Sequence, residues 1–300
     1  MRRLIAAGVA ALFTAAPGLA QDFGYLGHGR LVNNDVFFDL QDRWQSGSVA
    51  ASYVWGPEWQ GALPTRPGQM LEFRLHGQIV APDNLRNPDP ADRLYANAVS
   101  FGLHTHFQWR GIEIATGGDL VVTGDQTGLY HIQNMFHDII GVPKAEKAVR
   151  SAGIGNGFHG SLVAEVGRSF DMGNAQIRPF VEGRYGVETL VRAGVDLTVG
   201  EVGRGELLVR DPVSGNRYRT LKQHAPGFSF VMGADVAKVT DSIFLPEPAF
   251  GVEDRARVRA GVHWEGKKAR VFYGVTWLSK EFSAQTEGQV IGSLRLDYDF

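Results

Sequence analysis

Two groups of polar residues in this 300-residue chain could support chemistry, and the first lies near the N-terminus. Asn33, Asn34 and Asp35 are adjacent within a segment that otherwise resembles a strand, and Ser46 and Ser48 follow shortly after. Carboxylate and amide oxygens are hard ligands, and Ca²⁺ takes six or more such oxygens. The cluster therefore predicts either a cation site or the polar lining of a strand.

The second group lies in residues 127–140 (TGLYHIQNMFHDII), where apolar residues recur at spacings of three and four. This period predicts an amphipathic helix. Gln133 and His137 are four residues apart and therefore share a face of it. Histidine titrates near neutral pH, so His137 is a candidate general base. The residues alone leave open the alternative that His137 is simply solvated or hydrogen-bonded.

Other familiar catalytic patterns are absent from the sequence. It contains no Gly-x-Ser-x-Gly and no His-Glu-x-x-His motif. With no cysteine, it has no disulfide, thiolate metal site or cysteine nucleophile. Its 30 basic and 32 acidic residues are interspersed, which predicts no nucleic-acid partner.

The N-terminus predicts export. Arg2 and Arg3 precede an apolar stretch at residues 4–14, and small residues follow up to Ala20. This is the pattern of a cleaved signal peptide, and its apolar stretch is too short to span a bilayer. We therefore expect a signal peptide at residues 1–20 and one domain at residues 21–300.

Alternation near the C-terminus predicts strands. Residues 293–300 (SLRLDYDF) place leucines and aromatic residues on one face, with Arg295 and Asp297 on the other. Residues 257–264 (RVRAGVHW) alternate in the same way. A soluble sandwich or a transmembrane barrel gives this pattern. A last strand that ends at Phe300 resembles the insertion signal of outer-membrane barrels, and with the export signal it favours the barrel.

The rest of the chain supports an all-β, antiparallel transmembrane barrel in the bacterial outer membrane. Further strand-like segments lie at residues 27–34, 46–55, 69–80, 94–108, 111–123, 158–170, 175–186, 191–199, 218–223, 226–238 and 269–277. The total is roughly twelve strands, and single-chain bacterial barrels have an even number. The helix at residues 127–140 cannot form part of the wall, so it belongs to an extracellular loop or a plug, and we expect the extracellular loop.

Five motifs in this order resemble the LpxR-type lipid A 3′-O-deacylases. They are VNND (32–35), DRWQSGS (42–48), GQIVAPD (77–83), DRLYA (92–96) and QNMFHDIIG (133–141). The resemblance implies a twelve-stranded outer-membrane barrel with its active site between the wall and a loop helix. It also implies Ca²⁺-dependent hydrolysis of the ester-linked acyloxyacyl chain at the 3′ position of lipid A.

The resemblance also implies roles for individual residues. His137 matches the histidine that activates water, and Gln133 matches the glutamine one turn before it. Asn34 and Asp35 match the family's Asn-Asp pair, with Asp35 as a Ca²⁺ ligand. Ser46 matches the expected hydroxyl residue that follows the Asp-Arg pair at residues 42 and 43, and Ser48 is the alternative.

The chain departs from the family at one position after the histidine. The family often has an acidic residue there, whereas this chain has Pro143, with Asp138 and Glu146 as the nearest acidic residues. Two other functions stay open from the sequence: a phospholipid acyl hydrolase of the outer membrane, and a barrel without enzymatic activity. The expected partner is lipid A in the outer leaflet, and we expect a membrane-embedded monomer.

Overall fold

The computed structural model describes residues 23–37, 43–141, 144–221, 223, 225–246 and 249–298. The predicted signal peptide (1–20), Asp42, Pro143 and Phe300 lie outside these residues. The strands are β1 (Gly24–Asn34), β2 (Trp44–Gly56), β3 (Leu71–Ala81), β4 (Ala96–Trp109), β5 (Ile112–Thr123), β6 (Gly157–Gly167), β7 (Phe170–Met172), β8 (Ala175–Tyr185), β9 (Glu188–Val199), β10 (Leu207–Arg210), β11 (Arg217–Leu221), β12 (Gly227–Ser242), β13 (Arg255–Glu265), β14 (Ala269–Leu278) and β15 (Gln289–Tyr298). The helices are η1 (Asp125–Thr127), α2 (Leu129–Ile140) and α3 (Lys147–Ser151).

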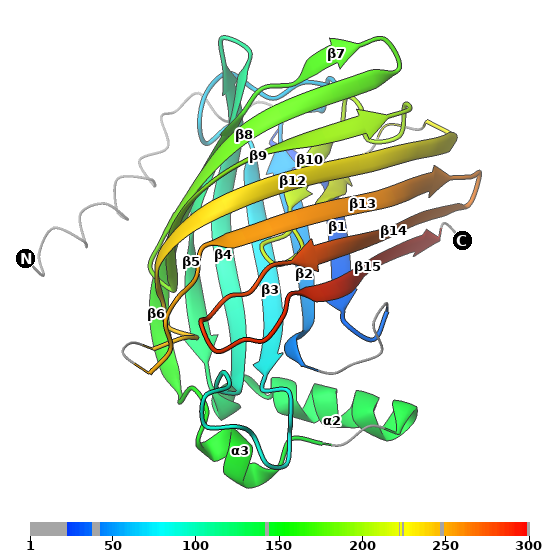
Figure 1. Cartoon of the computed structure of the whole chain (residues 1–300). Coiled ribbons are helices and arrows are strands. Elements are labelled where there is room, and N and C mark those ends of the chain that lie inside the picture. Colours follow the sequence, from blue (N-terminus) through cyan, green and yellow to red (C-terminus); the bar gives the residue numbers. More distant parts are fainter. Residues whose placement is uncertain are drawn as a thin grey trace, which may run out of the picture.

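Twelve long antiparallel strands form a closed barrel, as predicted (Figure 1). Each strand pairs with its neighbour along the barrel, β8 pairs with β6, and β15 closes the ring against β1. The short β7 extends the sheet beside β8. None of the helices in the described part of the chain is long and apolar enough to cross a bilayer.

The predicted alternation follows the two faces of the wall. In β15, Arg295 is 5% exposed and points into the barrel, whereas its neighbour Leu296 is 54% exposed on the outside. In β13, Arg257 is buried and Val258 is exposed in the same manner. The outward apolar face meets lipid and the inward face carries the charges, as the barrel interpretation requires.

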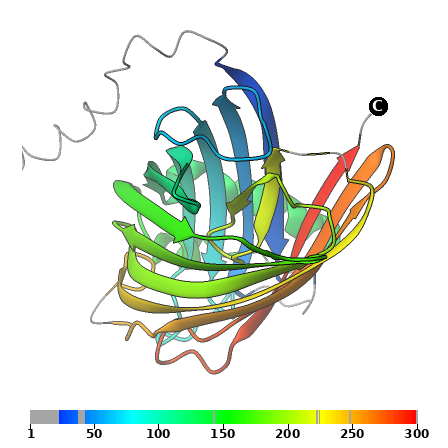
Figure 2. The same ribbon diagram turned by 90° about the horizontal axis from the view of Figure 1, so that it is seen from above.

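One predicted strand lies in an unexpected place. Residues 218–223 fall largely in β11, which pairs only with β10 in a separate two-stranded sheet. Figure 2 shows this hairpin inside the ring of strands. Its Tyr218 is fully buried with Leu31, Ala50 and Phe272 of the wall. Alternation cannot separate a wall strand from a strand inside the lumen, because both have one polar and one apolar face.

The two ends of the barrel differ. The helices and most of the long loops lie at one end (Figure 1). β15 runs toward the opposite end, where short turns join β4 to β5 and β13 to β14, and where the connection with the lumen hairpin leaves β9. Long loops are extracellular in outer-membrane barrels. We therefore call the end that carries α2 the outer rim.

Candidate active site

Helix α2 is bounded by glycines that suit its ends. Gly128 and Gly141 have φ values of 73° in the left-handed region, which favours glycine. The Gly141 N–H donates to the carbonyl oxygen of His137 and ends the helix. The predicted helix is therefore confirmed, but it starts at Leu129, because Gly128 separates it from the short η1.

Helix α2 begins against the outer surface of the barrel wall. A Cβ placed on Gly77 of β3 would lie 3.7 Å from the side chain of Leu129. Gly77 faces outward, because its neighbours His76 and Gln78 line a cavity inside the barrel. A Cβ at this distance would be in ordinary van der Waals contact, so α2 meets β3 here without requiring a glycine.

The two polar residues predicted to share a face do so, and this face is buried. Gln133 is 6% exposed and His137 is 5% exposed. The hydroxyl of Tyr95 donates to Gln133 Oε1 at 2.6 Å. Gln133 Nε2 in turn donates to Ser46 Oγ in a long contact of 3.5 Å. The arrangement fixes the glutamine amide with its N–H groups toward Ser46.

A β-bulge brings Ser46 into this contact. The pairing of β2 with β3 shifts between Trp44 and Gly47, so the strict alternation of β2 is interrupted there. Bulges re-aim side chains near strand ends. Ser46 is buried at this point and reaches Gln133, whereas Ser48 remains in register inside the barrel.

Asn34 and Asp35 lie at the end of β1. Asn34 lies beside Gly47 of β2, where an added Cβ would be 3.1 Å from Asn34 Nδ2. Asp35 is fully buried, and its carboxylate accepts backbone N–H bonds from Val36 at 2.8 Å and Arg43 at 2.9 Å. Asp35 thus joins the two sides of the loop between β1 and β2.

The adjacent Asn33 and the alternative serine, Ser48, belong to the lumen. Asn33 Nδ2 donates to Ser48 Oγ at 2.9 Å and to Asp211 Oδ1 at 3.0 Å. Ser293 donates to Asn33 Oδ1 at 2.6 Å. These contacts tie the end of β1 to the lumen hairpin. Asn33 therefore faces the lumen, whereas Asn34 lies beside Gly47 on the other face of the wall. Of the two serines, Ser46 contacts the helix and Ser48 contacts Asn33.

Neither nearby acidic residue on the helix side turns toward the site. Asp138 is exposed and pairs with Lys144 at 2.6 Å. Glu146 is exposed at the N-terminus of α3, where its backbone N–H donates to Leu85. Neither Asp138 nor Glu146 is therefore placed as the acidic residue that the resemblance implies after the histidine.

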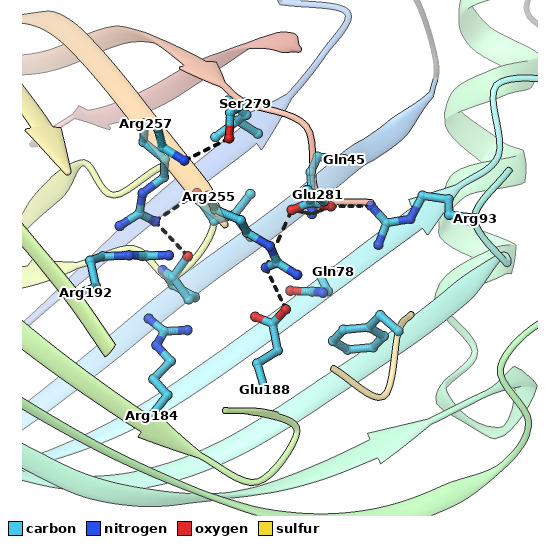
Figure 3. A pocket seen from close by; sticks show the side chains of 15 residues that line it. Gln45, Gln78, Arg93, Arg184, Glu188, Arg192, Arg255, Arg257, Ser279 and Glu281 are labelled. Atoms are coloured by element: carbon cyan, nitrogen blue, oxygen red, sulfur yellow. Dashed lines mark hydrogen bonds and ion pairs between the residues drawn. The ribbon is translucent and has the colours of Figure 1, made fainter. Parts of the chain in front are cut away.

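Charged side chains join the outer rim to the interior (Figure 3). Arg93 donates to Glu281 at 2.5 Å, and Arg255 lies between Glu281 and Glu188 at 3.6 and 2.7 Å. Gln45, next to Ser46, donates to Glu281 at 3.1 Å. Burial opposes ionisation of Glu281, but the guanidiniums of Arg255 and Arg93 hold its pKa below the ordinary value. The adjoining cavity has a volume of about 50 Å³.

Oxygen donors of the kind that a Ca²⁺ site needs lie at the end of β1. Asp35 and the amide oxygen of Asn34 are hard oxygen ligands of the kind that Ca²⁺ takes. Among the described residues, no three His, Asp or Glu side chains are grouped to hold a metal ion. A bound Ca²⁺ would be held by the Asp35 carboxylate together with neutral oxygens such as that of Asn34.

Comparison with known proteins assigns the chain to a family. The family model described as "Outer membrane protein LpxR" matches residues 5–300. The chain belongs to the LpxR family. The solved structure of LpxR from Salmonella typhimurium matches this LpxR-family chain with a TM-score of 0.73 at 16% identity, covering 91% of this chain and all of that one.

Other outer-membrane structures are less similar to this LpxR-family protein. The KdgM porin matches with a TM-score of 0.41 and 7% identity, over 91% of this chain and 98% of the porin. The β domain of the Bordetella autotransporter BrkA matches with a TM-score of 0.43 and 11% identity, over 91% of this chain and 100% of the β domain. No curated protein sequence matches the chain. Family and barrel together place the protein in the bacterial outer membrane.

Proposed function

We propose that this LpxR-family protein is a lipid A 3′-O-deacylase, which hydrolyses the ester-linked acyloxyacyl chain of lipopolysaccharide. The observation that supports the proposal most strongly is the buried polar cluster beneath α2. Gln133 and His137 turn toward the wall, and Ser46 reaches Gln133 from a bulged strand. Helix α2 starts on the outward surface of the wall, which a lipid reaches without leaving its leaflet.

His137 is the proposed general base. Its neutral imidazole takes a proton from a water molecule as the water oxygen forms a bond to the ester carbon. The tetrahedral intermediate then breaks its bond to the 3′ oxygen, which takes the proton back from the imidazolium. The products are a free 3′-hydroxyl on lipid A and the released acyloxyacyl carboxylic acid.

Gln133 is the proposed donor to the developing oxyanion. The Tyr95 hydroxyl occupies Gln133 Oε1 and leaves the amide N–H groups facing Ser46. A donor held in place before the reaction stabilises negative charge without a cost of reorganisation. Ser46 orients these groups, and Asn34 is placed beside them at the end of β1.

Asp35 is the proposed Ca²⁺ ligand, together with neutral oxygens such as that of Asn34. A Ca²⁺ ion bound there would supply positive charge to stabilise the ester oxyanion. We therefore expect activity to require Ca²⁺ and to be lost with EDTA. The Asp35→Asn variant should need a higher Ca²⁺ concentration than the unchanged protein.

The test is mass spectrometry of lipid A after incubation with the folded protein, with Ca²⁺ or with EDTA. We expect loss of one 3′ acyloxyacyl group with Ca²⁺ only. His137→Ala should abolish this loss, while His131→Ala, an exposed histidine on the same helix, should retain it. Heat-modifiable gel migration checks that each variant is folded.

Three outcomes would contradict the proposal. Turnover by His137→Ala would remove that residue from the base role. Lysophospholipid release with unchanged lipid A would assign a phospholipid hydrolase. Unchanged lipids from a folded barrel, at every Ca²⁺ concentration, would leave a barrel without this activity.

A further inference from the structure

The exposed surface of α2 carries large apolar side chains. Ile132, Met135 and Phe136 are 49%, 54% and 55% exposed, whereas the polar Gln133 and His137 are buried against the wall. A helix of a soluble protein has the reverse arrangement, with its apolar stripe toward the protein. The three side chains are therefore placed to meet something other than water.

The exposed surface is itself divided into two flanks. An α-helix turns by about 100° per residue, so Ile132 and Phe136 project to one side. His131 and Asp138 project to the other side and are also exposed. A helix with one apolar flank and one polar flank is suited to the boundary between a membrane and water.

The apolar flank continues the lipid-facing surface of the barrel. Leu129 of α2 packs on Gly77, and Gly77 pairs across the sheet with Val49, whose side chain is 47% exposed on the outside. On the opposite side of β1, Phe37 is exposed beside β15. A Cβ added to Gly292 of β15 would lie 2.5 Å from the Cβ of Phe37. Apolar side chains thus flank the candidate site on two sides.

We propose that α2 is embedded in the outer leaflet, with Ile132, Met135 and Phe136 among the acyl chains. The occupant of this surface is membrane lipid, because the surface is continuous with the wall that lipid already covers. The polar flank then faces extracellular water. This position would shield Gln133 and His137 from bulk water and open the site toward the leaflet.

The absence of cysteine makes a direct test possible, because one introduced cysteine is a unique label site. Phe136→Cys and the matched control Asp138→Cys carry a fluorophore on opposite flanks of the same helix. Loss of Asp138 breaks only an exposed ion pair, which stabilises little. Both proteins are reconstituted in phosphatidylcholine vesicles, with or without brominated acyl chains, and titrated with aqueous iodide.

We expect brominated chains to quench the label at position 136 at least threefold more than the label at 138, and iodide to show the opposite order. Equal iodide quenching at both positions would overturn the proposal. A label at position 136 that is protected from iodide but not quenched by brominated chains would also overturn the proposal. A second copy of the chain, and not lipid, would then cover the surface. The measurement needs no turnover, so its outcome is independent of the proposed activity.

Discussion

At the residue scale, the site depends on which side of the wall each polar group faces. Asn33 and Asn34 are adjacent, yet Asn33 is tied to Ser48 inside the barrel and Asn34 lies beside Gly47. The bulge at Trp44–Gly47 likewise separates the two serines, because Ser46 contacts Gln133 and Ser48 lies inside the barrel. The register of single residues therefore decides which polar groups meet at the candidate site.

In the proposed mechanism Tyr95, which lies in the DRLYA motif (92–96), is a positioning residue for Gln133. Tyr95→Phe removes the hydrogen bond that orients the Gln133 amide. A bond of this kind contributes about 1 kcal/mol, so we expect kcat to fall about fivefold with KM unchanged. Steady-state kinetics tests this, with the exposed Tyr185→Phe as control. A change in KM alone would contradict the orienting role.

The two serines should separate activity from stability. Ser46→Ala removes the group that contacts Gln133, and we expect turnover to fall between about ten- and a hundredfold. Ser48→Ala removes a partner of the buried Asn33, and we expect a cost of about 1–3 kcal/mol in unfolding free energy with little effect on turnover. Steady-state kinetics and urea unfolding of both variants test this. Lower turnover for Ser48→Ala and lower stability for Ser46→Ala would assign Ser48 to the site.

At the element scale, the wall, helix α2 and the lumen hairpin meet near the end of β1. Helix α2 starts on the outer surface at Gly77, and the β10–β11 hairpin fills the lumen behind β1. The hairpin reaches the end of β1 through Asp211 and Asn33. Wall, helix and hairpin therefore hold the site from both sides.

The hairpin requires glycine in β1. A Cβ on Gly29 would lie 2.3 Å from the carbonyl oxygen of Arg219 in β11. We expect Gly29→Ala to displace the hairpin and to cost about 1–3 kcal/mol in unfolding free energy. Gly183→Ala in β8 is the control, because its Cβ would meet nothing within 4 Å. Urea unfolding in detergent tests both, and equal stability would contradict the close packing.

At the scale of the whole molecule, the interior combines the apolar packing of the lumen hairpin with a network of paired charges. Arg210 donates to Glu165 at 2.6 Å and to Asp196 at 2.7 Å, and Arg178 donates to the same Glu165 at 2.7 Å. Breaking a buried pair costs more than forming it stabilises, because one charge is left without compensation. The network therefore holds the strands in one register.

The network predicts a stability that depends on pH. The pKa of Glu281 is lowered in the folded protein, so its stabilisation is complete above the ordinary value of 4.5 and is lost as the pH falls through the lowered value. We expect Glu281→Gln to cost about 3 kcal/mol at pH 7, and less at an acidic pH below the lowered pKa of Glu281.

Urea unfolding at both pH values measures this difference. Glu287→Gln is the control on the same loop, because Glu287 pairs with Arg43 but is largely exposed. It should change stability little at either pH. A cost for Glu281→Gln that does not vary with pH would contradict the electrostatic cause.

The sequence by itself determined the class of the fold and most of its strands. A period of two gives a strand one polar and one apolar face, so residues such as Arg257 and Val258 were assigned to opposite faces correctly. The export signal and the C-terminal aromatic residue then favoured lipid as the surroundings of the apolar face. The period of residues 127–140 likewise predicted α2, and the spacing of Gln133 and His137 predicted their shared face.

Only the tertiary structure decided which partners these elements meet. Alternation is identical for a wall strand and a lumen hairpin, so β11 was not distinguishable from the sequence. Helical period places polar and apolar residues on different faces but does not say which face is buried. In α2 the polar face packs against the wall, because the surroundings of this helix are lipid as well as protein.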